Sequence, residues 1–117
     1  MQPPDVSRYA DMFAAIGAEP RLRIMRLLLS AHPEGLVVGE LQAELGIAGS
    51  TLSHHLEKLR SERLVTVARE GTFLRYRANT ESLRELLGFL YEECCSRTGV
   101  SPPEVICVTR RRRDGRR

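Results

Sequence analysis

Residues 49–60 read GSTLSHHLEKLR, and this stretch decides the fold of the chain. Leu52, Leu56 and Leu59 fall at positions i, i+4 and i+7, so an α-helix would place them on one apolar face. The other face carries hydroxyls, an imidazole and an ammonium group, which can reach base edges and phosphates. Its candidate DNA-contacting residues are Ser50, Thr51, Ser53, His54 and Lys58. An ordinary amphipathic helix with a solvated face would show the same spacing, so the flanking segments decide between the two interpretations.

A short helix and a tight turn are predicted directly before this stretch. Residues 39–45 would form the helix, with Leu41 and Leu45 facing inward, and the glycine-containing residues 46–49 would form the turn. A short helix, a turn of about four residues and a longer helix have the geometry of a helix-turn-helix. Residues 49–60 then become the recognition helix, which enters the major groove of DNA.

A β-hairpin is predicted directly after the recognition helix. Residues 64–69 and 72–78 have the composition of strands, and Glu70 and Gly71 would form a two-residue loop. With that loop the cross-strand pairs on one apolar face would be Val67 with Leu74 and Val65 with Tyr76. A hairpin in this place is a wing, so the predicted fold is a winged helix-turn-helix, mainly α with a β-hairpin. We expect four wing side chains to lie along DNA phosphates: Arg69, Thr72, Arg75 and Arg77.

The remaining helices frame this unit. Pro20 suits the first turn of a second helix, whose wide apolar arc indicates a central position and whose arginines at 21, 23 and 26 mark the expected solvent side. The first helix (residues 5–16) and the last, which begins near Thr80, carry apolar stripes that a small core cannot fully cover. We expect them to pair between the subunits of a homodimer, which would present two recognition helices about 34–36 Å apart to an inverted repeat in double-stranded DNA. The stripe residues are Val6, Tyr9, Phe13 and Ile16, and then Leu83, Leu86, Leu87, Leu90, Tyr91 and Cys94.

The charge of the chain is unevenly distributed. The net charge is +3, but residues 110–117 alone contribute +5, so the remaining residues sum to −2. Residues 51–77 carry +3 and residues 80–95 carry −3. A basic middle on an acidic body fits a DNA-binding face directed away from another functional surface. We therefore expect a DNA-binding and dimerisation domain at 1–96 and an extension at 97–117 that ends in a disordered, Arg-rich tail.

Composition excludes several functional classes. The chain has no apolar run long enough to span a membrane and no secretory signal at its start, so we expect a cytoplasmic protein. It contains no phosphate loop, paired carboxylates or nucleophile–base motif, so an enzyme is not expected. Its three cysteines, in a reducing compartment, are candidate metal-binding or redox thiols rather than disulfide partners.

Four segments resemble the signature of the ArsR/SmtB metalloregulators. They are AEPRLRIMRLL at 18–28, STLSHHLEKL at 50–59, REG at 69–71 and RYR at 75–77. Together they extend over most of residues 5–91, in the order and spacing of the family. The resemblance implies a dimeric winged-helix repressor that leaves its operator when a metal or metalloid binds.

The metal sites of the family match this sequence only in part. Val37 and Gly39 stand where one branch of the family has cysteines, and residues 83–91 lack the Asp and His residues that hold zinc in another branch. What remains is Cys94 and Cys95 at the end of the last helix, together with Cys107. This set resembles the arsenic-responsive branch, which carries its thiols at the C-terminal end.

Thiol chemistry fits trivalent arsenic as the inducer. Soft thiolates prefer soft acceptors, trivalent arsenic takes three sulfurs, and a closed zinc site normally needs four ligands. His55 is expected to pack beside Leu56 rather than bind metal. Because adjacent helical residues do not face each other, Cys94 and Cys95 can share one atom only where the helix has ended.

Several alternatives remain open. A monomethylated arsenical would need only two thiols, so Cys107 could be a bystander. A thiol-oxidation sensor would link Cys107 to one of the other cysteines, and the same site could bind lead, cadmium, antimonite or bismuth. A constitutive architectural protein that binds nucleic acid through its tail would show a strong salt dependence and no operator preference.

Overall fold

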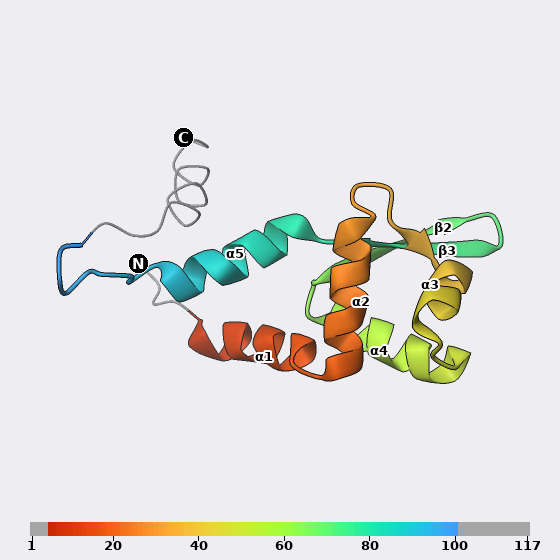
Figure 1. The fold of residues 1–117 in the computed structure, drawn as a ribbon, viewed down its shortest axis with the longest axis horizontal. Coiled ribbons are helices and arrows are strands. Elements are labelled where there is room, and N and C mark those ends of the chain that lie inside the picture. Colours follow the sequence, from red (N-terminus) through yellow and green to blue (C-terminus); the bar gives the residue numbers. More distant parts are fainter. Residues whose placement is uncertain (1–4, 101–117) are drawn as a thin grey trace. The chain divides into compact units, whose positions relative to one another are not determined.

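The computed structural model describes residues 5–100, which form five helices and a three-stranded antiparallel sheet (Figure 1). In chain order the elements are α1 (Val6–Ile16), α2 (Glu19–Ser30), β1 (Leu36–Val37), α3 (Val38–Leu45), α4 (Gly49–Ser61), β2 (Val65–Glu70), β3 (Phe73–Ala78) and α5 (Thr80–Tyr91). The predicted winged helix-turn-helix, mainly α with a β-hairpin wing, is confirmed. The chain divides into two compact parts, one ending at Thr80 and one beginning at Glu81.

The part up to Thr80 is built around leucines from the two central helices. Helix α2 contributes Leu28 and α4 contributes Leu52, Leu56 and Leu59, and each of these side chains is at most 1% exposed. α1, α2 and α4 contact one another, α2 also contacts β3, and α4 also contacts β2. The i, i+4, i+7 spacing thus places the apolar face of α4 in the core and leaves its opposite face outside.

The predicted helix-turn-helix is formed by α3 and α4. Gly46 ends α3 in a left-handed conformation (φ 65°), which glycine adopts without strain, and its N–H donates to the carbonyl of Gln42. Gly49 begins α4, and a Cβ on it would lie 3.1 Å from the side-chain nitrogen of Gln42. The two helices are therefore close at this point, which favours a residue without a side chain.

The hairpin forms, but in a register different from the predicted one. Val67 pairs with Tyr76 and Arg69 with Leu74, so the loop is Gly71-Thr72 rather than Glu70-Gly71. Gly71 has a φ of +63°, as two-residue hairpin loops of the primed types require at their first position. Because the pairing shifts by two residues, each side chain still lies on its predicted face of the sheet.

A third strand was not predicted. β1 pairs with β3 through Leu36 opposite Tyr76 and Val37 opposite Arg75. Two residues are too short to show an alternating pattern, so only the tertiary structure reveals this strand. Its consequence is that the loop before β1 lies against the wing.

The helix faces confirm one expectation and correct another. In α1, Met12 and Ala15 are the buried residues, whereas Val6 is 61% exposed and Phe13 36% exposed. The predicted stripe therefore lies mainly outside the core of the single chain. In α2, Arg21 is half-buried and hydrogen-bonded, so it does not share the solvent side with Arg23 and Arg26.

The part from Glu81 on consists of most of α5 and the turns that follow it. Leu86 is fully buried, whereas Leu87 is 45% exposed and Leu90 58% exposed. The helix ends at Tyr91, before the predicted stripe reaches Cys94. Within residues 5–100, no helix has the length and apolar character needed to cross a membrane.

Candidate nucleic-acid interface and thiol site

Helix α4 presents its predicted DNA-contacting residues to solvent. Its core residues, Leu52, Leu56 and Leu59, are buried, and this fixes the rotation of the helix. The residues predicted to contact DNA are all exposed: Ser50, Thr51, Ser53, His54 and Lys58. This is the accessibility that base and phosphate contacts require, and the contacts themselves stay a prediction.

Arg21 of α2 joins α1 to α4, because it is hydrogen-bonded both to the backbone of Ala15 and to the side chain of His55. Nε of Arg21 donates to the carbonyl oxygen of Ala15 at 2.6 Å, and its Nη1 lies 3.1 Å from Nδ1 of His55. Because a guanidinium can only donate, Nδ1 of His55 accepts, and the ring is neutral. Burial, and then the charges of Arg21 and His54, lower the pKa of His55 below its usual value. His55 thus has a hydrogen-bonded structural role beyond the predicted packing.

The wing residues predicted to contact DNA fall into two groups. Arg69 and Thr72 are exposed at the end of the hairpin, and the side chain of Arg69 forms no hydrogen bond or ion pair with another residue in the range 5–100. Arg75 and Arg77 are half-buried and bonded within the protein. Only the first pair is therefore available to phosphates without breaking an existing contact.

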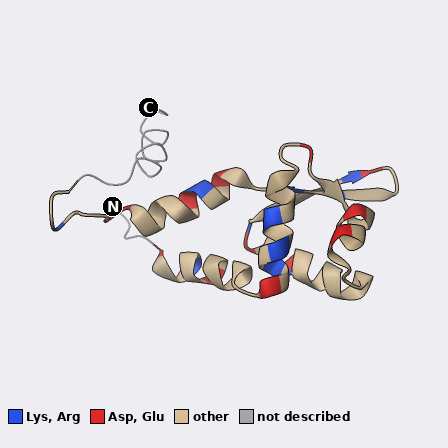
Figure 2. Cartoon of the chain, in the orientation of Figure 1, with Lys and Arg blue, Asp and Glu red and all other residues tan. Residues whose placement is uncertain are grey.

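Glu70 forms ion pairs with both Arg75 and Arg77. Nε of Arg75 donates to Oε1 of Glu70 at 2.9 Å, and Nη2 of Arg77 lies 3.9 Å from Oε2 of the same carboxylate. Arg75 also reaches the carbonyl oxygen of Gly35 at 3.4 Å, and Arg77 donates to that of Pro33 at 3.2 Å. The hydrogen bond that Arg75 donates to Glu70 is the main cause that raises the pKa of Arg75. Figure 2 shows the acidic and basic stretches next to each other along the wing.

Sequence reasoning did not identify Glu70 as part of this interface. The alternation of side chains could have identified it, because residues 70, 73, 75 and 77 share one face of the hairpin in the observed register. The loop that supplies the two carbonyl oxygens comes from a distant part of the sequence, so no local pattern reveals it.

Two thiols lie next to each other beyond the end of α5. The N–H of Cys94 donates to the carbonyl oxygen of Tyr91 at 2.8 Å, and Cys95 adopts a left-handed conformation with φ 63°. This departure from helical geometry brings the two Sγ atoms to 3.4 Å. The distance is well above the ~2.05 Å of a disulfide, so the two sulfurs are not bonded to each other in this structure. The helix has ended before both cysteines, so the predicted stripe does not continue to Cys94, and the condition under which the two thiols can share one atom is met.

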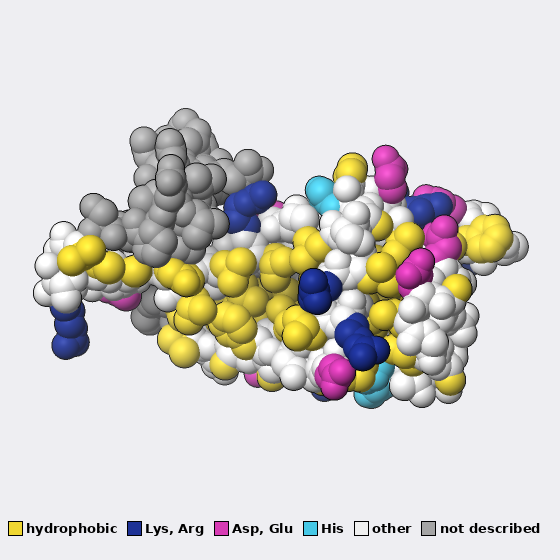
Figure 3. All heavy atoms as spheres, in the orientation of Figure 1, with side chains coloured by type: hydrophobic (Ala, Val, Ile, Leu, Met, Phe, Trp, Pro, Cys, Tyr) yellow, Lys and Arg dark blue, Asp and Glu magenta, His cyan; other side chains and the backbone are white. Residues whose placement is uncertain are grey.

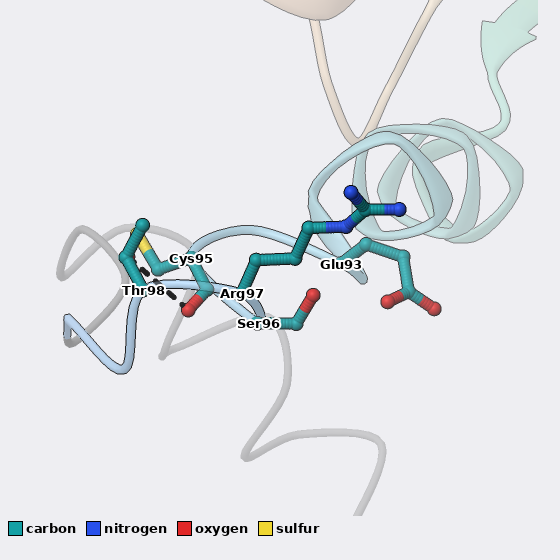
Figure 4. Close-up of a pocket in the computed structure, with 5 residues that line it drawn as sticks. All are labelled: Glu93, Cys95, Ser96, Arg97 and Thr98. Atoms are coloured by element: carbon teal, nitrogen blue, oxygen red, sulfur yellow. Dashed lines mark hydrogen bonds between the residues drawn. The ribbon is translucent and has the colours of Figure 1, made fainter.

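Cys95 lines an open pocket of about 490 Å³ (Figure 4). Glu93, Ser96, Arg97 and Thr98 line the rest of it. Oγ1 of Thr98 donates to the carbonyl oxygen of Cys95 at 3.4 Å, and the sulfur points toward Thr98, away from Glu93 and Arg97. A small solute can therefore reach this thiol from solvent.

The described residues supply two of the three predicted thiol ligands. No group of three His, Cys, Asp or Glu side chains suited to a metal ion occurs within residues 5–100. Cys107, the third predicted ligand, lies outside the described residues.

Comparisons with known proteins agree with this fold. A helix-turn-helix domain family matches residues 17–68. The nodulation protein NolR of Rhizobium meliloti is 31% identical over 93 residues, which cover 77% of this chain and 76% of NolR. An ArsR-like transcriptional regulator from Rhodococcus sp. RHA1 has a similar structure, with a TM-score of 0.64 and 26% identity over 74% of this chain and 79% of its own.

A third comparison concerns a protein described as a homodimer. The homodimeric winged helix-turn-helix DNA-binding domain of a Mycobacterium bovis protein superposes with a TM-score of 0.61 and 26% identity, and the match covers 83% of this chain and 90% of that one. The shared fold, the exposed recognition helix and these relatives lead to one assignment. The chain belongs to the ArsR/SmtB family of winged helix-turn-helix transcriptional regulators.

Proposed function

We propose that this regulator is a dimeric repressor that binds an inverted-repeat operator and leaves it when trivalent arsenic binds Cys94 and Cys95. The observation that carries the proposal is the 3.4 Å distance between the two sulfurs. Two metal–sulfur bonds of about 2.3 Å, the length found for zinc, can join sulfurs up to about 4.6 Å apart. The pair can therefore bind one soft atom without large rearrangement.

The reaction requires only the two thiols and the arsenical. Each thiol that binds replaces one hydroxyl group of arsenite and releases one molecule of water. Two such exchanges use both described cysteines and leave one position on the arsenic atom. When the ligand is arsenite, Cys107 would occupy this position. When the ligand is methylarsenite, its methyl group already occupies it. Zinc fits less well, because a closed zinc site needs four ligands and the described residues offer two sulfurs here.

The dimer part of the proposal is supported by exposed apolar side chains. Val6 and Phe13 of α1 are exposed, and so are Leu87 and Leu90 of α5. Figure 3 shows such hydrophobic side chains at the surface over each of these helices. A second subunit that covers them would place two α4 helices on one DNA duplex. Arsenic binding just beyond α5 would then alter this interface and the spacing of the recognition helices, with a coupling of typically about 1–3 kcal/mol.

The test is DNA release under anaerobic conditions, with a duplex selected from a random pool by the wild-type protein. Fluorescence anisotropy follows the release as arsenite or methylarsenite is added. The wild type is expected to dissociate, whereas Cys94→Ser and Cys95→Ser are expected to bind the same duplex and stay bound. Ser96→Ala is the matched control and should respond like the wild type. Release of both cysteine variants by arsenite would contradict the proposed site, and release by peroxide alone would indicate an oxidation sensor.

A further inference from the structure

We propose that Glu70 is a specificity-determining residue that holds Arg75 and Arg77 away from DNA phosphates and so limits sequence-independent binding. The inference rests on the DNA binding of the proposed function but does not involve arsenic. It concerns a carboxylate in the hairpin that is predicted to face phosphates, where a negative charge opposes binding to DNA.

The geometry places all three side chains on one face of the wing. Glu70 ends β2, and Arg75 and Arg77 lie on β3 with the matching alternation. One carboxylate oxygen accepts from Arg75 at 2.9 Å, and the other lies 3.9 Å from Arg77. A single carboxylate thus pairs with two guanidinium groups and leaves the three side chains with a net charge of +1.

The loop before β1 completes the arrangement. Its carbonyl oxygens at Pro33 and Gly35 accept from Arg77 and Arg75. Gly35 is buried and has a φ of +76°, and a Cβ there would collide with the carbonyl oxygen of Tyr76 and lie 2.7 Å from Cγ of Arg77. Only glycine lets the loop approach so closely. The two arginines are therefore directed toward the body of the domain.

Arg69 provides the contrast within the same hairpin. It lies on the opposite face, opposite Leu74, and is exposed, without an ion pair to any residue between 5 and 100. Arg69 can meet a phosphate without breaking an ion pair within residues 5–100, whereas Arg75 and Arg77 must first leave Glu70. Because ion pairs at the surface are weak, Glu70 moderates the phosphate affinity of these arginines rather than abolishing it.

The experiment measures affinity for a short mixed-sequence duplex as a function of salt, without any arsenical. Glu70→Gln is expected to bind about three- to ten-fold more tightly than the wild type, because two arginines become available. The plot of log K against log salt should become steeper, by up to about 1.8 for two new phosphate contacts. Glu81→Gln is the matched control, since it removes the same charge from a carboxylate that pairs with Arg84 on α5. It is expected to leave both quantities close to those of the wild type.

A double-mutant cycle separates release of the arginines from a simple change of charge. In an Arg75→Gln/Arg77→Gln background, Glu70→Gln should no longer increase affinity. An equal gain in both backgrounds would overturn the inference, and so would weaker or unchanged binding by Glu70→Gln in the native background. Thermal melts verify the fold of each variant. If Glu70→Gln unfolds, Glu70→Asp replaces it. The expected gain in DNA affinity is then smaller and again depends on both arginines. A wild-type protein that binds no DNA would instead contradict the proposed function itself.

Discussion

Apolar side chains are buried to different extents in the two parts of the chain, the one up to Thr80 and the one from Glu81 on. The first part buries leucines from α2, α3 and α4 and orients the recognition helix within one chain. The second leaves Leu87 and Leu90 exposed and ends in turns that hold two adjacent thiols. The recognition helix is thus oriented within a single chain, whereas the proposed sensing would need two additions, a second subunit and a ligand.

The largest expected effect comes from the core of the first part. Leu28 is fully buried on α2, and Leu28→Ala should lower the free energy of unfolding by about 2–5 kcal/mol through lost burial and a cavity. Leu29→Ala, one residue along and 37% exposed, is the matched control and should cost much less. Urea denaturation followed by circular dichroism measures both. Equal losses in the two variants would show that the core is not organised as described.

The next effect concerns association rather than folding. Leu90 is 58% exposed on α5, so Leu90→Glu should leave the monomer folded and separate the subunits of the proposed dimer. Loss of the second recognition helix is expected to weaken operator binding by about 100-fold or more. Sedimentation and anisotropy measure the two quantities, and Leu90→Met should retain both. A dimeric Leu90→Glu protein with full affinity would place the interface elsewhere.

The smallest effect is a pH dependence of stability in the first part. Burial and the neighbouring Arg21 lower the pKa of His55 in the folded protein. The unfolded chain therefore binds a proton more readily, so the contribution of neutral His55 is complete above pH ~6.5 and is lost as the pH falls toward the folded pKa. His55→Gln should reduce this loss relative to the wild type, whereas His54→Gln should keep it. Urea midpoints at several pH values provide the measurement.

Much of the fold could be predicted because apolar spacing alone specifies the helices. The leucines of α4 show the pattern clearly, and both the helix-turn-helix and the wing follow from it. The hairpin register could not be fixed, because a shift of two residues keeps Val65, Val67 and Tyr76 on the same face. β1 was missed because two residues show no period.

The candidate sites were predictable only where a local pattern carries them. The exposed residues of α4 and the adjacent cysteines can be identified from the chain. The contact between Arg21 and His55, and that between Glu70 and the wing arginines, join residues through the tertiary structure. The approach of the two sulfurs likewise depends on the backbone angle of Cys95, which side-chain periodicity does not reveal.

The central claim, that Cys94 and Cys95 form the arsenical site, is tested most directly by an anaerobic count of reactive thiols. Arsenite, methylarsenite, zinc and peroxide are added separately to the wild type and to Cys107→Ser. We predict that an arsenical protects Cys94 and Cys95 together, and that a third thiol is lost with arsenite in the wild type but not in Cys107→Ser. Full reactivity of both Cys94 and Cys95 in the presence of either arsenical would contradict the account.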